Sequence, residues 1–152
     1  MIEDKLLKAA RAGDAEALFT VGLCHYQGVG TAQNKIEALK YFEDSAGRGN
    51  TRAKYYAATM YRRGEETPKN LEKAETYYRE VLEDTLFADE RVRRDVCFCM
   101  AVIYARTGRR EKSMALYRHL AEQGDKRARY TLGLLEGTDE KADNSWGKHI
   151  GK

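Results

Sequence analysis

Proline, cysteine and long apolar runs are all scarce in this sequence, and each scarcity excludes a class of protein. The chain holds a single proline, Pro68, which favours uninterrupted helices because proline breaks a helix from within. Three cysteines, Cys24, Cys97 and Cys99, are too few for a disulfide framework, so we expect reduced thiols. No stretch approaches the roughly 20 apolar residues that span a bilayer, so we expect no membrane-spanning helix.

An excess of one charge is also lacking. The 27 lysines and arginines nearly balance the 24 aspartates and glutamates, which leaves a net charge of +3. This balance does not favour nucleic acid as the partner, because a nucleic-acid-binding domain concentrates basic side chains on one face. The opening residues 1–5 are acidic at once and no long apolar run follows them, unlike a secretory signal. Together with the reduced thiols, this predicts a cytoplasmic protein.

Residue patterns that support catalysis or metal binding are missing too. The three histidines, His25, His119 and His149, fall on separate predicted elements with no paired metal spacing. Cys97 and Cys99 lie two residues apart on a predicted helix, so their thiols point about 200° apart and suit chelation poorly. We therefore predict no catalytic residue, no metal site and no cofactor, with the cysteines serving as small core residues.

Helix-forming residues are abundant. Alanine, leucine, lysine, arginine and glutamate dominate, and all five favour helices. A hydrophobic fraction of 42% supplies a core, while a charged fraction of 34% supplies a solvated surface. Residues 16–49 are typical of a helix, a turn at 28–30 and a second helix. The composition and this stretch predict an all-α fold.

Small residues in this stretch recur downstream at matching intervals. Each copy has a small anchor in its first helix and another in its second helix, and these pairs are Gly22 and Ala38, Ala58 and Ala74, and Ala101 and Ser113. Bulky side chains follow the second anchor by three and four positions, at 41–42, 77–78 and 116–117. Small anchors let helices approach closely, and the bulky side chains fill the space between hairpins. One hairpin cannot bury its own apolar stripe, so the pattern predicts stacking.

The junctions between copies share one form, with alanine, glycine, Asp or Asn, and alanine at fixed spacing. It occurs at 10–17, 46–53 and 121–128. The glycine is expected to end one helix in the left-handed conformation. The Asp or Asn beside it is expected to cap the next helix.

These residues resemble the Sel-one-like repeat, a relative of the tetratricopeptide repeat, over about residues 6–137. The resemblance implies an α-solenoid of antiparallel helix hairpins that form a right-handed superhelix. We expect about three and a half hairpins within 1–137, followed by a polar tail at 138–152 that is frayed or docked through Trp146. The resemblance also implies that the first helices of the hairpins line a concave groove.

Two departures from the repeat pattern concern the third copy. Thr85 stands where a closing glycine is expected, and about seven extra residues follow at 86–92. They either lengthen a helix by roughly two turns or form a loop. The turn at 108–110 is shorter than the equivalent turns in the first two copies.

Aromatic and basic residues are expected along the groove. An aromatic stands three positions before each anchor, and arginines lie beside it by helical spacing. The candidate partner-binding residues are Phe19, Tyr26, Arg52, Tyr55, Arg62, Arg63, Phe98, Arg106, Arg127 and Tyr130. The aromatics either grip a peptide or pack between repeats. The arginines either form a strip that binds carboxylates, which would favour an acidic partner, or belong to an ordinary solvated face.

The function that these patterns favour is a protein–protein interaction scaffold. Such an adaptor, regulator or immunity-type inhibitor would bind a peptide or protein partner in its groove. The alternative is a hydrolase of the β-lactamase-like kind linked to some cysteine-rich relatives of the repeat family. This chain lacks the regular cysteine pairs of those relatives. Self-association through the ends of the solenoid is a third possibility.

Overall fold

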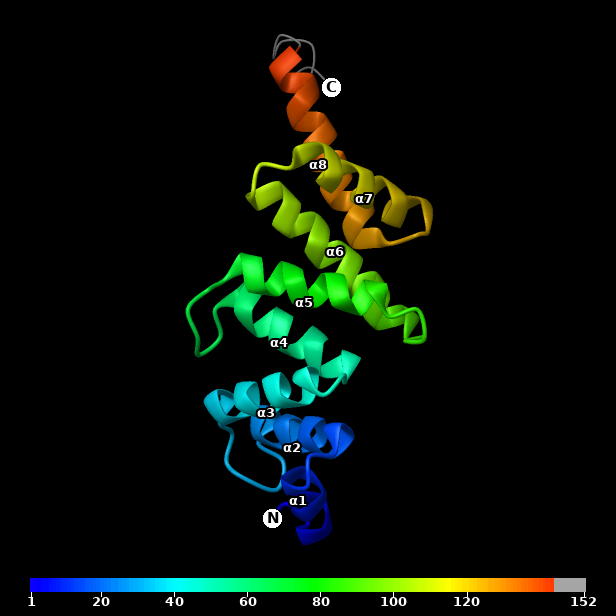
Figure 1. Ribbon diagram of the computed structural model, residues 1–152. Coiled ribbons are helices and arrows are strands. Elements are labelled where there is room, and N and C mark those ends of the chain that lie inside the picture. The colour runs from blue at the N-terminus through cyan, green and yellow to red at the C-terminus, as the bar shows by residue number, and fades with distance from the viewer. Residues whose placement is uncertain (144–152) are drawn as a thin grey trace. The chain divides into compact units, whose positions relative to one another are not determined.

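The computed structural model describes residues 1–143, with side chains described up to residue 137 (Figure 1). Within these residues the chain forms eight helices and no strand, which confirms the all-α prediction. The helices are α1 (Asp4–Arg11), α2 (Ala15–Gln27), α3 (Lys35–Gly47), α4 (Thr51–Arg63), α5 (Leu71–Glu83), α6 (Glu90–Arg106), α7 (Arg110–Glu122) and α8 (Lys126–Asp143). The first residues of the predicted tail are thus helical, and Trp146 lies outside the described residues. None of the described helices is both long and apolar enough to cross a membrane.

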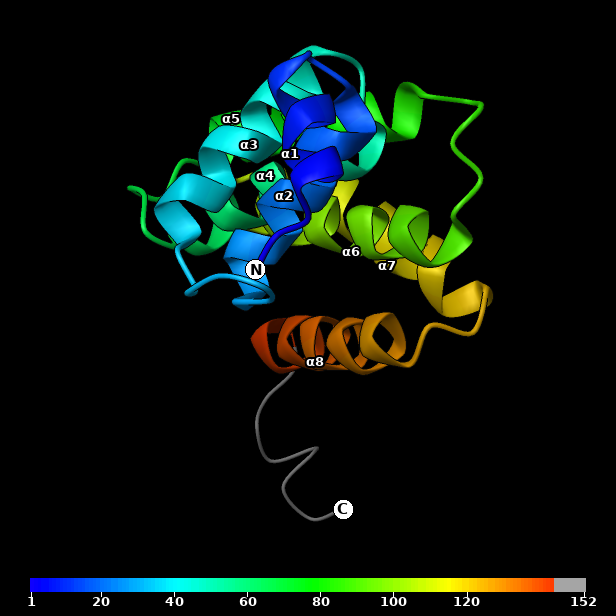
Figure 2. The same ribbon diagram turned by 90° about the horizontal axis from the view of Figure 1, so that it is seen from below.

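The chain divides into two compact units, Met1–Val96 and Cys97–Lys152, with the boundary inside α6. In the first unit each helix packs on the next along the chain, from α1 through α5. Figure 2 views this unit along the stack, with α3 and α5 on one side and α2 and α4 on the other. Contacts between sequence neighbours are the signature of stacked hairpins, as the repeat pattern predicted.

The junctions between hairpins follow the predicted form. The closing glycines Gly13, Gly49 and Gly124 have positive φ values of 90°, 95° and 91°. The next residues are Asp14, Asn50 and Asp125, whose side chains accept hydrogen bonds from the backbone N–H three residues later at 2.8, 2.9 and 3.0 Å. Three residues separate the two helices at each of these junctions, which restricts the angle between hairpins.

The main core of the first unit forms where α3 packs between α2 and α4. Phe42 is fully buried there, with its ring centroid 5.8 Å from that of Phe19 and 5.2 Å from that of Tyr56. Gly22 makes this packing possible, because a Cβ atom at that position would lie 2.8 Å from the Phe42 ring. The small anchor thus allows α2 and α3 to approach closely, as expected.

The inserted residues form a loop and also lengthen a helix. The chain between α5 and α6 spans 84–89, and α6 has 17 residues where α2 has 13. The guanidinium of Arg93 holds this connection, because it donates to the backbone oxygens of Val81, Leu82, Asp84 and Phe87 at 3.3, 3.0, 3.0 and 3.3 Å. One side chain from the added helical turn therefore satisfies carbonyl groups along the whole connection.

The second unit has its own core, built on the same residue pattern. Ala101 of α6, Tyr117 and Leu120 of α7, and Ala128 of α8 are buried together. The Ser113 hydroxyl donates to the Ala101 carbonyl at 2.7 Å, so the two anchors of this copy touch directly. The connection between α6 and α7 spans 107–109 and is shorter than that between α2 and α3, which spans 28–34, as the sequence predicted.

Substituting the anchor Gly22 by alanine is expected to destabilise the protein by about 1–3 kcal/mol, because the added methyl group overpacks against a buried ring. The matched control is Gly47→Ala, since Gly47 is also helical but has no atom near its missing Cβ. Alanine there is expected to be neutral or to stabilise the helix by up to about 1 kcal/mol. Urea unfolding followed by circular dichroism measures both. Equal stability of the two variants would contradict the close-approach argument.

Replacing Arg93 by alanine is expected to lower the free energy of unfolding by about 2 kcal/mol, because several buried carbonyl groups lose a charged donor. Limited proteolysis should cut within 84–89 faster than in the wild type. Arg91→Ala, at an exposed position of the same helix, is the control and should change neither measurement. If Arg93→Ala resists protease as well as the wild type does, the connection at 84–89 keeps its structure without the Arg93 side chain.

Candidate functional site

The predicted aromatic column separates into core and surface residues. Phe19 is only 4% exposed and packs against Phe42 and Tyr56, so it belongs to the core and cannot contact a partner. These contacts favour packing between repeats over contact with a peptide as the role of Phe19. Tyr55 is half-buried and donates its hydroxyl to Asp95. In the second unit, Phe98 is half-buried and Tyr130 is 71% exposed.

The predicted basic residues divide between the two units. Arg52, Arg62 and Arg63 lie on α4, whereas Arg106 and Arg127 belong to the second unit. Arg106 is exposed, and the guanidinium of Arg127 lies 3.3 Å from Asp125 and 4.3 Å from the ring centroid of Phe98.

Each arginine on α4 has a polar neighbour within the first unit. Arg52 pairs with Asp89 of the inserted loop at 2.7 Å, so it helps to hold that loop. Arg62 donates to the Tyr78 hydroxyl at 3.3 Å. Arg63 pairs with Glu65 at 3.3 Å, and its side chain is 55% exposed.

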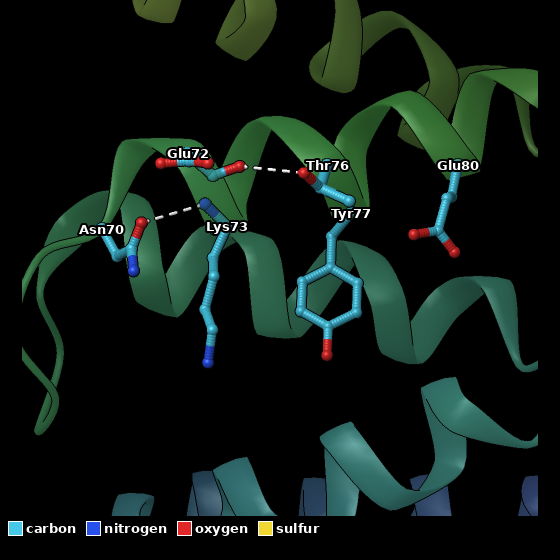
Figure 3. Close-up of a pocket in the computed structure, with 6 residues that line it drawn as sticks. All are labelled: Asn70, Glu72, Lys73, Thr76, Tyr77 and Glu80. Carbon is cyan, nitrogen blue, oxygen red and sulfur yellow. Dashed lines mark hydrogen bonds between the residues drawn. The ribbon is translucent and has the colours of Figure 1, made fainter.

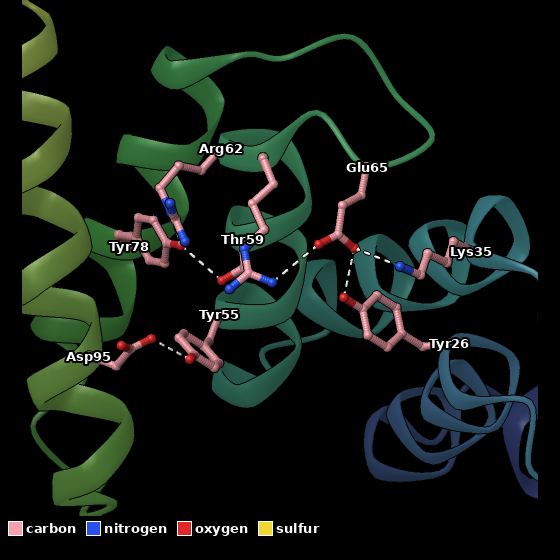
Figure 4. Close-up of polar contacts among 9 residues, drawn as sticks. Tyr26, Lys35, Tyr55, Thr59, Arg62, Glu65, Tyr78 and Asp95 are labelled. Carbon is pink, nitrogen blue, oxygen red and sulfur yellow. Dashed lines mark hydrogen bonds and ion pairs between the residues drawn. The ribbon is translucent and has the colours of Figure 1, made fainter.

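Glu65 is the centre of a polar cluster that the sequence argument missed (Figure 4). One carboxylate oxygen accepts the Tyr26 hydroxyl at 2.7 Å and lies 3.4 Å from the Lys35 ammonium. The other oxygen accepts a guanidinium hydrogen bond from Arg63. Glu65 directly follows Gly64, which ends α4, so helical spacing could not place its side chain. The cluster joins the first hairpin to the second.

The electrostatics of this cluster favour an ionised carboxylate. Burial raises the pKa of Glu65, but hydrogen bonds from Tyr26, Arg63 and Lys35 outweigh burial and hold this pKa below its ordinary value. Burial and the hydrogen bond to Glu65 raise the pKa of Tyr26 to about 12, so its hydroxyl stays a donor at neutral pH.

Further polar contacts continue along the same side of the first unit (Figure 4). The hydroxyl groups of Thr59 and Tyr78 lie 2.8 Å apart, next to Arg62. The hydrogen bond from the Tyr55 hydroxyl to the Asp95 carboxylate is the last of these polar contacts. We call this surface the α2/α4 face, and define it by Tyr26, Lys35, Tyr55, Tyr56, Thr59, Arg62, Arg63, Glu65 and Asp95.

A separate pocket of about 510 Å³ lies along α5 (Figure 3). Its lining consists of Asn70, Glu72, Lys73, Thr76, Tyr77 and Glu80. Beside it, the Tyr61 hydroxyl donates to the Glu43 carboxylate at 2.6 Å. The rings of Tyr61 and Tyr77 stack with their centroids 6.5 Å apart. Burial, followed by the effect of Glu43, raises the pKa of both tyrosines to about 12. These neutral hydroxyls and the glutamate link α3, α4 and α5.

Groups that could hold a metal are absent from the described residues, where no three His, Cys, Asp or Glu side chains converge. Cys24, Cys97 and Cys99 form no disulfide among the described residues.

The Sel1 repeat family matches this chain at residues 15–50 and 51–80. This chain contains two Sel1 repeats. The first match covers the α2–α3 hairpin, and the second covers most of the α4–α5 hairpin. All residues of the α2/α4 face except Asp95 therefore lie within this pair of adjacent Sel1 repeats. Proteins with such repeats are typically scaffolds for protein–protein interactions without a catalytic role.

Two solved structures support the Sel1 repeat fold. The first is a protective antigen present in uropathogenic Escherichia coli strains that displays an SLR fold, with 30% identity and a TM-score of 0.66 over 87% of this chain. This chain spans only 28% of that antigen. The second is a Sel1 repeat protein from Oxalobacter formigenes, with 22% identity, a TM-score of 0.62, and coverage of 85% of this chain and 95% of that one. A search of curated proteins found no match.

Glu65→Gln is expected to lower the free energy of unfolding at pH 7 by about 1 kcal/mol, because the ionised acceptor of three donors is lost. Since folding lowers the pKa of Glu65, its contribution is present above the ordinary pKa of a glutamate and disappears as pH falls through the folded-state pKa. Wild type and variant should therefore converge in acid. Urea unfolding between pH 7 and pH 3 measures the difference, and a difference independent of pH would contradict the role of the charge.

Proposed function

We propose that this chain is a scaffold that binds an acidic segment of a partner protein on the α2/α4 face. The observation that carries the proposal is the environment of Glu65. Its carboxylate is bound by a hydroxyl, an ammonium and a guanidinium group, so this face already holds the donors that a carboxylate needs.

An acidic side chain from a partner can add to this cluster without displacing Glu65. A guanidinium has five donor hydrogens, and that of Arg63 extends from a side chain that is 55% exposed. The Lys35 side chain is 32% exposed and offers further donors. A second carboxylate can thus bridge the two basic groups while each keeps its contact with Glu65.

Tyrosine rings supply apolar contact on the same face. Tyr26, Tyr55 and Tyr56 are half-buried, and the ring of Tyr56 meets those of Tyr26 and Tyr55 edge-on at 6.1 and 5.6 Å. Rings held by their neighbours lose little freedom on binding. Tyrosine and arginine are also enriched among the residues that dominate interface energies. A peptide with both apolar and acidic side chains fits this surface best.

A face that binds without reacting suits an adaptor, a regulator or an immunity-type inhibitor. Three cysteines outside any disulfide support a reducing compartment such as the cytoplasm. Phe98, Arg106, Arg127 and Tyr130 belong to the second unit, so the α2/α4 face does not need them.

Arg63→Glu is expected to reduce partner capture at least tenfold, because it replaces a donor by a repelling charge beside Glu65. Arg79→Glu is the matched control, since Arg79 is 51% exposed and pairs with Glu75 on α5 at 2.8 Å. Immobilised wild type and both variants are compared by affinity purification and quantitative mass spectrometry, with circular dichroism to confirm folding.

The captured partner then identifies the chemistry of recognition. Overlapping peptides of that partner are probed with the wild-type chain, and the acidic residues of each binding peptide are replaced by their amides. Binding should fall with the number of acids removed. Capture that is equal for Arg63→Glu and Arg79→Glu, or binding that ignores the acids, would overturn the proposal.

A further inference from the structure

The last described helix, α8, repeats the pattern of α2, but no helix among the described residues packs on its small anchor. Ala17 and Gly22 in α2 correspond to Ala128 and Gly133 in α8, with the same spacing. In α2 a Cβ atom at Gly22 would meet the Phe42 ring of α3 at 2.8 Å, whereas at Gly133 no atom lies within 4 Å. The anchor that α3 covers in the first hairpin is therefore open in α8.

Neighbouring positions show the same difference. Tyr130 stands where α2 has Phe19, and its exposed fraction is 71% compared with 4% for Phe19. Leu134 stands where α2 has Leu23, and it is 56% exposed, whereas Leu23 packs against the core. The anchors of the two intervening copies, Ala58 and Ala101, are fully buried. The first helices of the other hairpins, α2, α4 and α6, therefore have the corresponding surface covered.

The open surface is distinct from the face by which α8 joins the second unit. Ala128, Leu132 and Leu135 pack into the core with α7. Tyr130, Gly133, Leu134 and Gly137 form a second stripe at helical spacing on a different side. An apolar stripe of this kind is normally covered in a folded protein or its complex.

The repeat itself shows which shape covers such a stripe. In the first hairpin the covering element is an antiparallel amphipathic helix, α3, whose Phe42 sits over the small anchor. The C-terminal half of α3 lies beside the start of α2, as the hydrogen bond from Ser45 to the Ala15 carbonyl shows at 2.6 Å. That half of α3 carries Glu43 and Asp44.

Charge at the start of α8 complements such a helix. Lys126 and Arg129 are exposed there, next to the position that the acidic half of an antiparallel helix would take, whereas Arg127 pairs with Asp125 of this chain. We propose that the open stripe of α8 docks one amphipathic helix of a partner protein, with an aromatic side chain against Gly133 and acidic side chains toward the start of α8. This site lies in the second unit and does not depend on the α2/α4 face.

The test uses a helix that is known to cover this pattern. A fluorescein-labelled peptide of residues 34–50, which contains α3, is titrated with the full chain up to about 1 mM while anisotropy is measured. Saturable binding is expected. Gly133→Gln should weaken it at least tenfold, because the longer side chain prevents close approach. The matched control is Gly47→Gln, at a helical glycine of α3 that also has open surroundings. This variant should bind the peptide as the wild type does.

Four further measurements decide the occupant. A peptide with Phe42→Ala should bind at least tenfold more weakly, and hydrogen exchange should slow in α8 when the wild-type peptide binds. No saturable binding, or equal binding by Gly133→Gln, would overturn the proposal. A dimer seen by light scattering in the wild type but lost in Gly133→Gln would assign the stripe to a second copy instead. Peptide binding only by a chain that ends at Asp143 would assign it to residues 144–152, and either result would overturn the partner helix.

Discussion

The structure depends on how closely a bulky ring can approach a helix backbone. Phe42 reaches α2 because Gly22 has no side chain, and the buried ring then also contacts Phe19 and Tyr56. The same relation between small anchor and covering helix recurs where Ser113 touches Ala101 in the second unit. Since hairpins cannot bury their apolar stripes alone, these close contacts are what convert separate hairpins into a packed stack.

Elements governed by local rules were predictable from the sequence. The capping side chains at 14, 50 and 125 and the left-handed glycines before them depend only on adjacent residues, and the structure has them as expected. The burial of Phe19 was less certain because helical phase alone cannot tell a groove from the space between repeats. It depends on Phe42 and Tyr56, which come from two other helices.

The candidate site was harder to predict than the fold, for a physical reason. Glu65 lies just after α4, where helical spacing gives no direction, and its three donors come from α2, α3 and α4. Helical spacing suggested a basic strip, but Arg52 and Arg63 meet carboxylates within the first unit. The resulting face is a matched set of donors and acceptors. Under the proposed function, specificity for a partner would depend on the geometry of this face more than on net charge.

The role of Arg93 has a consequence for how this chain can change. Its guanidinium donates to backbone oxygens, which every amino acid supplies. These hydrogen bonds therefore do not depend on which side chains stand in the connection at 84–89. Leu86 at its tip is 93% exposed. The position of Leu86 can therefore accept sequence variation, or a grafted epitope, while Arg93, Asp84 and Asp89 keep their contacts.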